Sequence, residues 1–424
     1  MQAYRAQLLR FGADGQPLYD SDGLLVVDAG SDGVQRVVDA GDFRALAVRH
    51  ARVPVTHRPD RIIAPGFIDM HVHYPQTDII GAPADGLLPW LEHYTFPAEA
   101  RFSDPAYAAE VARFFVDELL RNGVTTALTF ATTHPASVDA LFAAAQRRGL
   151  RMMGGKVLQD RHSPDGLRDD TEQSLIDSET LLQRWHGQDR LGYAITPRFA
   201  PTSSEAQLRG AGELAAKYPD TWIHSHAAEN KDEVRWVREL FPKARSYLDV
   251  YQGFGLLRKR AVYAHCIHLD DADRQLMRAT GAAAAVSPTS NLFLGSGFFD
   301  FDGAQQHGMR HGLASDVGGG TSFSPFHTML AAYYAGREGQ TKPGLSLKPS
   351  RLWWLHTGGA ARALGLEGVI GTLQPGSEAD FVLLDPKATP LLARKTERAQ
   401  NLEELLFALI VLGDDRVVDQ VVIA

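Results

Sequence analysis

Eight short runs of apolar, β-prone residues recur through the middle of the chain, and this pattern restricts the fold more than any other feature. The runs are 67–73, 124–132, 152–158, 192–199, 222–227, 261–265, 282–287 and 312–316. Most of the segments between them have the spacing of amphipathic helices. Strands that alternate with helices predict an α/β fold. Eight such units fit a (β/α)8 TIM-like barrel better than the alternative, an open sheet.

One of the intervening segments shows the helical pattern clearly. Its apolar residues share one face at steps of three and four, namely Ala108, Val111, Ala112, Phe115 and Leu119. Asp104-Pro105 supplies a capping side chain and a first-turn proline, and Asn122-Gly123 ends the pattern. We therefore expect a helix that begins near Pro105 and packs against the barrel.

Both ends of the chain have a different pattern. Partly alternating apolar residues and turn signals such as Asp14-Gly15 predict β-strands within residues 1–64. Residues 368–424 have the same character, with strands expected at 378–385 and 416–423. We predict that 1–64 and 368–424 form one small discontinuous β domain, into which a barrel of residues 65–367 is inserted.

The single cysteine, Cys266, limits the chemistry that is open to the chain. One thiol cannot form a disulfide within the chain, and zinc sites built on thiolates need at least two cysteines. A metal ion must therefore be held by carboxylates and by some of the 16 histidines. The scarcity of cysteine also favours a reducing, cytoplasmic compartment.

The overall charge argues against several classes of partner. Fifty-one acidic residues against 43 basic ones give a net charge of −8, which disfavours binding to nucleic acid or to anionic lipid. The longest apolar run, 405–412, is too short to cross a bilayer, and the first residues lack the apolar core of a secretory signal. We expect neither a nucleic acid nor a membrane partner.

Side chains that can bind a metal stand at the ends of four predicted strands. His71 and His73 are two residues apart in the first run, so their side chains face the same way. His226 ends the fifth run, His265 the sixth and Asp316 the eighth. The carboxyl ends of barrel strands meet at one rim, so the sequence predicts a metal site there. Nitrogen and oxygen ligands suit Zn²⁺, although Fe²⁺ and Mn²⁺ use similar sets.

Taken one at a time, these residues have simpler interpretations. A lone H-x-H pair is often two hydrogen-bonded buried histidines, and Asp316, which precedes a run of glycines, is often a loop cap. Their joint placement at strand ends favours the metal site. His224 shares a face with His226 but lies one layer deeper, so we expect it to pack. We expect Lys156 to be a buried hydrogen-bonded amine and Cys266 a small buried filler.

The chain resembles the guanine deaminases of the amidohydrolase superfamily in a series of motifs that occur in the expected order. They are PGFIDMHVHYPQTDIIGA, LLPWLEHYTFPAEARF, TPRFAPTSS, SHAAENKDEV, AHCIHL, VSPTSNLFLGSG, ASDVGGGTSFSPF and GTLQPGSEADFVLLD. H-V-H and A-S-D are common to the superfamily, whereas H-Y-P-Q-T-D, Y-T-F-P-A-E and T-P-R-F are typical of guanine deaminases. The resemblance extends from about Arg61 to Asp385. Cys266 and Ala227-Ala228 depart from it without removing a side chain that the chemistry needs.

The resemblance implies a role for each candidate residue. The ligands of one Zn²⁺ per subunit would be His71, His73, His226 and Asp316. The catalytic residues would be Glu229, which shuttles protons, Asp316, and His265, which contacts the attacking water or the substrate. The substrate-binding residues would be Gln76, Arg198, Phe199, His265, Glu229 and Trp90. Trp90 lies on a loop that would cover the pocket, and ordinary packing is an equal alternative for it.

The implied reaction is hydrolytic deamination of the free base guanine to xanthine and ammonia. Guanine and water would be the small-molecule partners, and the resemblance implies a homodimer. Two alternatives remain open. A related deaminase of the superfamily would act on a modified purine, a pterin or a triazine through different recognition residues. A non-catalytic scaffold would keep the barrel and lose its ligands, whereas this sequence retains all of them.

Overall fold

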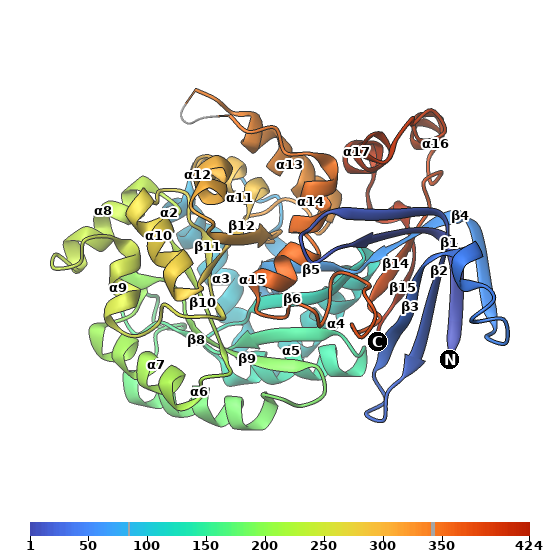
Figure 1. The fold of residues 1–424 in the computed structure, drawn as a ribbon. Coiled ribbons are helices and arrows are strands. Elements are labelled where there is room, and N and C mark those ends of the chain that lie inside the picture. Colours follow the sequence, from blue (N-terminus) through green and yellow to red (C-terminus); the bar gives the residue numbers. More distant parts are fainter. Residues whose placement is uncertain (84, 341–343) are drawn as a thin grey trace.

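Buried apolar strands and amphipathic helices alternate through the middle of the chain, as the sequence pattern predicts, and they form a barrel (Figure 1). The structure is a computed structural model that describes residues 1–83, 85–340 and 344–424. A second, smaller sheet lies beside the barrel and contains strands from both ends of the chain (Figure 1).

The barrel sheet contains eight neighbouring parallel strands among the described residues. They are β5 (Phe67–His73), β6 (Val124–Phe130), β7 (Arg151–Gly155), β9 (Leu191–Pro197), β10 (Trp222–Ala227), β11 (Ala261–His265), β12 (Ala283–Val286) and β13 (Arg310–Leu313), with the short β8 (Val157–Leu158) paired to β9. The segment after β13 returns to β5, where Asp316 N–H donates to His71 O at 2.9 Å and His73 N–H donates to Val317 O at 2.8 Å. These bonds join the two ends of the sheet, which confirms the barrel over the open sheet.

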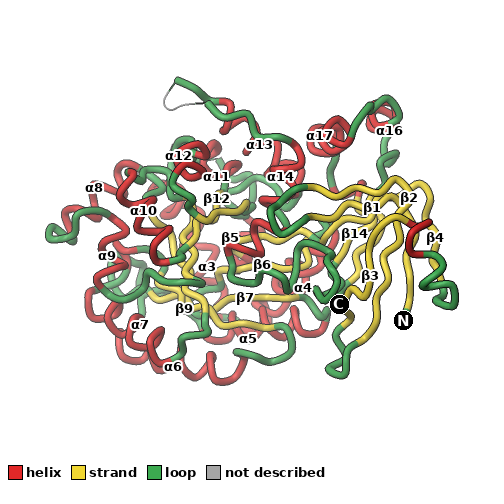
Figure 2. Tube along the Cα trace, viewed as in Figure 1, coloured by secondary structure: helices red, strands yellow, loops and turns green. Residues whose placement is uncertain are grey.

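Helices surround the barrel strands (Figure 2). They are α4 (Pro105–Arg121), α5 (Pro135–Arg147), α6 (Thr171–Trp185), α7 (Glu205–Lys217), α8 (Lys231–Leu240), α9 (Tyr247–Gly253), α10 (Asp271–Thr280), α11 (Pro288–Phe293), α12 (Phe301–Gln306), α13 (Pro325–Arg337), α14 (Pro349–Leu355) and α15 (Gly358–Ala363). α4 confirms the sequence pattern: the Asp104 side chain accepts the Ala106 N–H, and Ala108, Ala112 and Phe115 are fully buried. Within the described ranges, no helix is long and apolar enough to cross a membrane.

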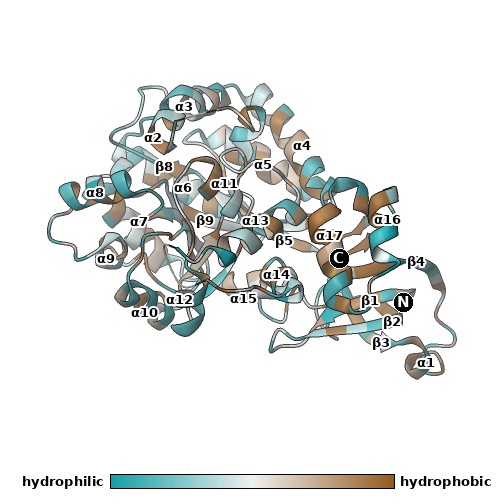
Figure 3. Ribbon diagram, turned by 90° about the horizontal axis from the view of Figure 1, so that it is seen from above, coloured by the Kyte–Doolittle hydropathy of each residue, from teal (hydrophilic) through white to brown (hydrophobic). Residues whose placement is uncertain are grey.

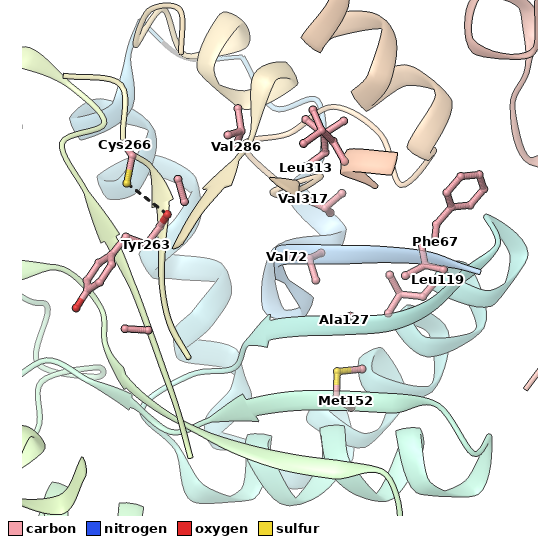
Figure 4. Close-up of a cluster of buried hydrophobic side chains, with 14 of the residues drawn as sticks. Phe67, Val72, Leu119, Ala127, Met152, Tyr263, Cys266, Val286, Leu313 and Val317 are labelled. Carbon is pink, nitrogen blue, oxygen red and sulfur yellow. Dashed lines mark hydrogen bonds between the residues drawn. The ribbon is translucent and has the colours of Figure 1, made fainter. Parts of the chain in front are cut away.

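The main core lies between the outer face of the barrel sheet and these helices (Figure 4). Val72 of β5 and Ala127 of β6 are fully buried there, together with Leu119 of α4. Burial of apolar surface at about 25 cal/mol per Å² is the main force that holds helices on the sheet. A separate apolar cluster, which includes Met70, Leu128 and Val262, fills part of the barrel interior, and polar side chains gather at the carboxyl rim.

The small sheet has the strand order β15-β14-β4-β1-β2-β3 in the described part of the chain. Its N-terminal strands are β1 (Gln2–Phe11), β2 (Pro17–Ala29), β3 (Gln35–Asp42) and β4 (Val55–Pro65), with the short helix α1 (Phe43–Leu46) after β3. Its C-terminal strands are β14 (Phe381–Leu384) and β15 (Val418–Val422). β14 runs antiparallel to β4, with Phe381 opposite Pro65, so the two ends of the chain meet inside one sheet.

The tail differs from the β-rich expectation between β14 and β15, where it forms two helices. These are α16 (Pro390–Thr396) and α17 (Leu402–Leu412), and α17 packs against α13 and α14 of the barrel. Leu406, Leu409 and Ile410 are buried in this contact, and the apolar character of α17 is plain in Figure 3. The apolar run at 405–412 therefore serves the core of this chain.

Buried ion pairs connect the small sheet to the amino-terminal side of the barrel strands. Arg190, which precedes β9, donates to Asp380 Oδ1 at 3.0 Å and lies 2.8 Å from Glu378 Oε2. Arg151, at the start of β7, contacts Glu378 at 2.5 Å. Arg190 is only 8% exposed and Asp380 only 2%. Removal of one partner from such a pair leaves an uncompensated buried charge.

We expect Arg190→Met to lower the free energy of unfolding by about 3–5 kcal/mol, because Asp380 would stay buried without its cation. Urea denaturation measures the loss. Arg184→Met is the matched control, since Arg184 pairs with Asp139 on the surface, where such pairs contribute about 0–1 kcal/mol. Equal losses in the two variants would show that the Arg190 pair does not fasten the sheet to the barrel.

Candidate active site

The first two candidate ligands come from β5, where alternation places both imidazoles on the inner side of the barrel. His71 and His73 are buried, and their Nε2 atoms lie 3.1 Å apart. His226, at the end of β10, brings its Nε2 to 3.2 Å from that of His73. Three imidazole nitrogens from two strands therefore face one point.

Asp316 reaches the same point from the segment after β13. Its Oδ1 lies 3.0 Å from His71 Nε2 and 3.4 Å from His73 Nε2. Its Oδ2 lies 3.7 Å from Nε2 of His265, which ends β11. Ligand atoms of His71, His226, His265 and Asp316 all lie within 4.8 Å of one another. The structure thus brings all five predicted side chains together at one rim.

The backbone turns sharply where these strands end. Ala228 after β10, His265 at the end of β11 and Asp316 after β13 have φ angles of 52°, 68° and 54°. Residues other than glycine rarely adopt this left-handed conformation, and such positions cluster at functional sites. The turns bring the side chains that follow each strand in over the mouth of the barrel.

The hydrogen bonds of the imidazoles leave their inner nitrogens free to bind a cation. His226 Nδ1 lies 2.7 Å from the Arg198 carbonyl oxygen, which can only accept, so Nδ1 carries the proton and the Nε2 lone pair faces the centre. His71 Nδ1 contacts His224 Nε2 at 2.7 Å, an arrangement that suits the same tautomer. His224 therefore does more than pack, because it orients His71 from behind.

The spacing and charge of this donor set fit a divalent metal. Nitrogen atoms that bind zinc at about 2.0–2.1 Å in a tetrahedral or octahedral arrangement lie about 2.9–3.4 Å apart, which matches the distances between these imidazoles. Burial lowers the pKa of His73 to about 4 and the pKa of His226 well below its usual range, so both rings are neutral ligands at neutral pH. Burial opposes the ionisation of Asp316, but His71 and His73 outweigh it and hold the Asp316 pKa well below its ordinary value.

Glu229 lies beside the metal-binding group and is suited to donate a proton. Its Oε2 is 3.4 Å from His265 Nε2, and its Oε1 accepts a hydrogen bond from Ser296 Oγ at 3.1 Å. Burial, together with the negative charge of Asp316, raises the pKa of Glu229 to about 8. A carboxyl group with this pKa carries its proton at neutral pH, as a general acid requires.

Two residues that position Glu229 and His265 were not predicted from the sequence. Glu233 Oε2 accepts the backbone N–H groups of Glu229 and Asn230, at 2.9 and 3.0 Å, as part of the capping box of α8. Asn291 Oδ1 lies 2.8 Å from His265 Nδ1, which fixes that ring. The signal for Glu233 was the spacing N-x-x-E before a helix, and Asn291 lies in the quoted motif VSPTSNLFLGSG.

The candidate metal ligands open into a cavity at the carboxyl rim of the barrel. The cavity is lined by His73, Gln76, Leu87, Trp90, Leu91, Arg198, Phe199, His226, Glu229, His265, Leu294, Asp316 and Gly319. Its apolar walls come largely from the covering segment, defined here as residues 74–83 and 85–103, whose short helices follow β5. Trp90 is 3% exposed and donates its indole N–H to Ala82 O at 3.2 Å, so its side chain is packed within the covering segment. It also lines the cavity.

Gln76 and Arg198 enter the cavity together and share a partner that the sequence analysis missed. Gln76 Nε2 donates to Glu99 Oε1 at 3.1 Å, and Arg198 Nη1 donates to Glu99 Oε2 at 2.6 Å. Glu99 belongs to α3 (Phe96–Ala100) and is 1% exposed. The only sequence signal for it was its place in the motif Y-T-F-P-A-E.

The remaining polar candidates have structural partners. Lys156 is buried, and its Nζ contacts Asp169 at 2.6 Å, as expected for a hydrogen-bonded amine in the barrel. Cys266 is buried, and burial raises the pKa of its thiol, so it is an inert filler at neutral pH.

Comparison with known proteins gives a consistent picture. The model of the amidohydrolase family matches residues 62–424. The guanine deaminase of Escherichia coli is 47% identical over 356 residues, which are 84% of this chain and 80% of that protein. The solved E. coli guanine deaminase has a TM-score of 0.94 at 41% identity and covers 100% of this chain and 98% of its own. A guanine deaminase from C. acetobutylicum, solved with guanine bound in its active site, has a TM-score of 0.91 at 28% identity and covers 100% and 98%.

Proposed function

The chain belongs to the amidohydrolase family, and because it is a homologue of the guanine deaminases, we propose that it hydrolyses free guanine to xanthine and ammonia. The observation that carries the proposal is the meeting of three imidazoles, Asp316 and the acid Glu229 at one cavity. Water must attack a ring carbon that is a poor electrophile, and this set supplies both a cation site and a proton donor for that attack.

We assign the metal site to one Zn²⁺ per subunit, held by His71, His73, His226 and Asp316. The first three are neutral imidazoles and the fourth is an ionised carboxylate, a set that zinc prefers. When bound, a divalent metal lowers the pKa of water from about 15.7 to about 7, which supplies a nucleophile at neutral pH. His265, fixed by Asn291, is placed to hydrogen-bond the attacking oxygen.

Two carboxyl groups carry the protons in this proposal. Asp316 accepts a proton from the attacking water, while Glu229 donates its proton to N3 of guanine and so makes C2 electrophilic. The water oxygen bonds to C2. Glu229 then takes the proton of the new hydroxyl and passes it to the amine, which leaves as ammonia when its bond to C2 breaks. The proton on Asp316 restores Glu229, so one proton of water replaces the proton that Glu229 gave to N3, and the other leaves with ammonia.

Recognition of the purine falls to other side chains that line the cavity. Arg198 donates to O6 of guanine, Gln76 hydrogen-bonds the same edge, and Phe199 offers an apolar wall to the ring. Trp90 closes the cavity from the covering segment. A site built for these hydrogen bonds rejects bases that leave its buried polar groups unpaired.

A panel of bases tests the proposal. Protein purified without added metal should contain about one zinc per chain, and it should convert guanine to xanthine with release of ammonia, measured by absorbance and by a coupled ammonia assay. Adenine, a pterin and a triazine are assayed in the same way as alternative substrates. Faster ammonia release from any of these than from guanine would replace the proposed substrate, and a metal-free, inert protein would favour the scaffold.

The compartment and the assembly are further parts of the proposal. A single, buried cysteine suits a reducing compartment, so we propose that the reaction takes place in the cytoplasm. The homodimer implied by the family resemblance stays a prediction, and gel filtration with light scattering measures it.

A further inference from the structure

Glu99 occupies an unusual position between two polar residues that line the cavity, Gln76 and Arg198. It does not line the cavity itself, it is 1% exposed, and each of its carboxylate oxygens accepts one hydrogen bond. One bond comes from the Gln76 amide at 3.1 Å and the other from the Arg198 guanidinium at 2.6 Å. A buried carboxylate of this kind is stable only while its donors stay in place.

The partners of Gln76 settle which way its amide points. A carboxylate can only accept, so the NH₂ group of Gln76 must face Glu99. The Gly318 N–H can only donate, and Gln76 Oε1 accepts it at 3.2 Å on the other side. The opposite orientation would oppose donor to donor and acceptor to acceptor. One lone pair of the amide oxygen is therefore taken by Gly318, and the second N–H of Gln76 is left for the cavity.

Arg198 offers donors by its nature. Its guanidinium carries five N–H groups and no acceptor, and Glu99 takes one of them. The same guanidinium lies 5.4 Å from the centre of the Phe96 ring, which also belongs to α3, so the covering segment holds it from two sides. The wall of the cavity made by Gln76 and Arg198 is thus a surface of N–H donors.

We propose that Glu99 is a positioning residue that sets the specificity of the site for purines with an oxygen at C6. This inference rests on the proposed function and deepens it. Glu99 holds the Arg198 guanidinium in place and orients the Gln76 amide so that an N–H faces the cavity. The wall formed by these two side chains is therefore complementary to a carbonyl oxygen. The same wall opposes an amino group at C6, which is itself a donor, and leaves buried N–H groups without acceptors.

The sharpest comparison is between guanine and 2,6-diaminopurine. Both bases carry the 2-amino group that the proposed reaction removes. They differ along one edge, where guanine has an oxygen at C6 and a proton on N1, and 2,6-diaminopurine has an amino group at C6 and no proton on N1. The ratio of kcat/KM for guanine to kcat/KM for 2,6-diaminopurine therefore reports on the wall and cancels changes in the chemistry at C2.

Glu99→Gln is the direct test. The amide that this substitution introduces must turn its oxygen to Arg198, which leaves its NH₂ group facing Gln76. Gln76 then meets a donor on either side, from this NH₂ group and from the Gly318 N–H, so its amide is no longer held with an N–H toward the cavity. We expect the ratio to fall about 10- to 100-fold, with a larger rise in KM for guanine than fall in kcat and with unchanged metal content. Glu92→Gln is the control, because Glu92 is exposed on the same covering segment and should keep the wild-type ratio.

A second variant keeps the test decisive if Glu99→Gln does not fold. Glu99→Asp retains the charge, but its shorter side chain cannot reach both donors, so the ratio should fall in the same direction by a smaller factor. If turnover of both bases falls equally in the folded variants, Glu99 is only structural and the inference is wrong. If the wild-type protein does not act on guanine, the proposed function fails first, and the two failures are thereby told apart.

Discussion

Replacing Glu229 by Gln is expected to lower kcat by about 10²–10⁴-fold while the protein keeps its metal, the range found when a general acid–base is removed. The amide has nearly the shape of the carboxyl group and still accepts from Ser296, but it cannot release a proton to N3 of guanine. Burial and the negative charge of Asp316 raise the pKa of Glu229 to about 8, so the wild-type side chain carries an acidic proton at neutral pH. The amide of the variant has no such proton.

Steady-state kinetics and metal analysis of the same samples test this prediction. Glu213→Gln is the control, because Glu213 is exposed on α7, far from the strand ends that carry the site. The control should retain wild-type turnover. A fully active Glu229→Gln variant would remove this residue from the proton transfers, and a variant that loses its metal would make Glu229 a ligand instead.

Replacing Asp316 by Ala is expected to abolish turnover by emptying the metal site. Changes to residues that only orient a metal ligand cost about 10–100-fold in affinity, so the loss of a ligand should cost more. The variant also removes the only carboxylate within 4 Å of the ring nitrogens of His71 and His73 among the described residues. Metal content after dialysis, measured by mass spectrometry of the element, should fall far below one ion per chain.

His71→Ala should give the same loss, because its Nε2 and Asp316 Oδ1 lie 3.0 Å apart at the same centre. Asp165→Ala is the control, since that carboxylate is 91% exposed on the surface. Normal zinc stoichiometry in both the Asp316 and His71 variants would refute the proposed ligand set. Full activity after complete removal of metal would refute the hydrolytic mechanism as well.

The barrel and the meeting of the candidate metal ligands could be predicted because their signals are local. Alternation along β5 fixes that His71 and His73 share a face, and the rule that strand ends meet at one rim brings His226, His265 and Asp316 to the same place. Each of these statements needs only a few consecutive residues. Their agreement across four strands made the site visible before any contact was known.

Glu99 could not be found in this way, because its importance lies in contacts between distant segments. Its two partners, Gln76 and Arg198, follow different strands, and the covering segment that carries it consists of helices too short to show a clear period in the sequence. The tail shows a different limit. The run at 405–412 is apolar on all sides, so periodicity alone cannot separate a helix from a buried strand, and packing against α13 and α14 decides for the helix.

The strand order of the small sheet has a consequence for folding during synthesis of the chain. β4 pairs with β1 on one side and with β14 on the other, yet β14 is synthesised only after the whole barrel. Domains usually fold as they leave the ribosome. In this sheet, one edge of β4 stays unpaired until β14 has been synthesised, and until then that edge can pair with a neighbouring nascent chain. The last stretch to be translated is thus what protects the first from aggregation.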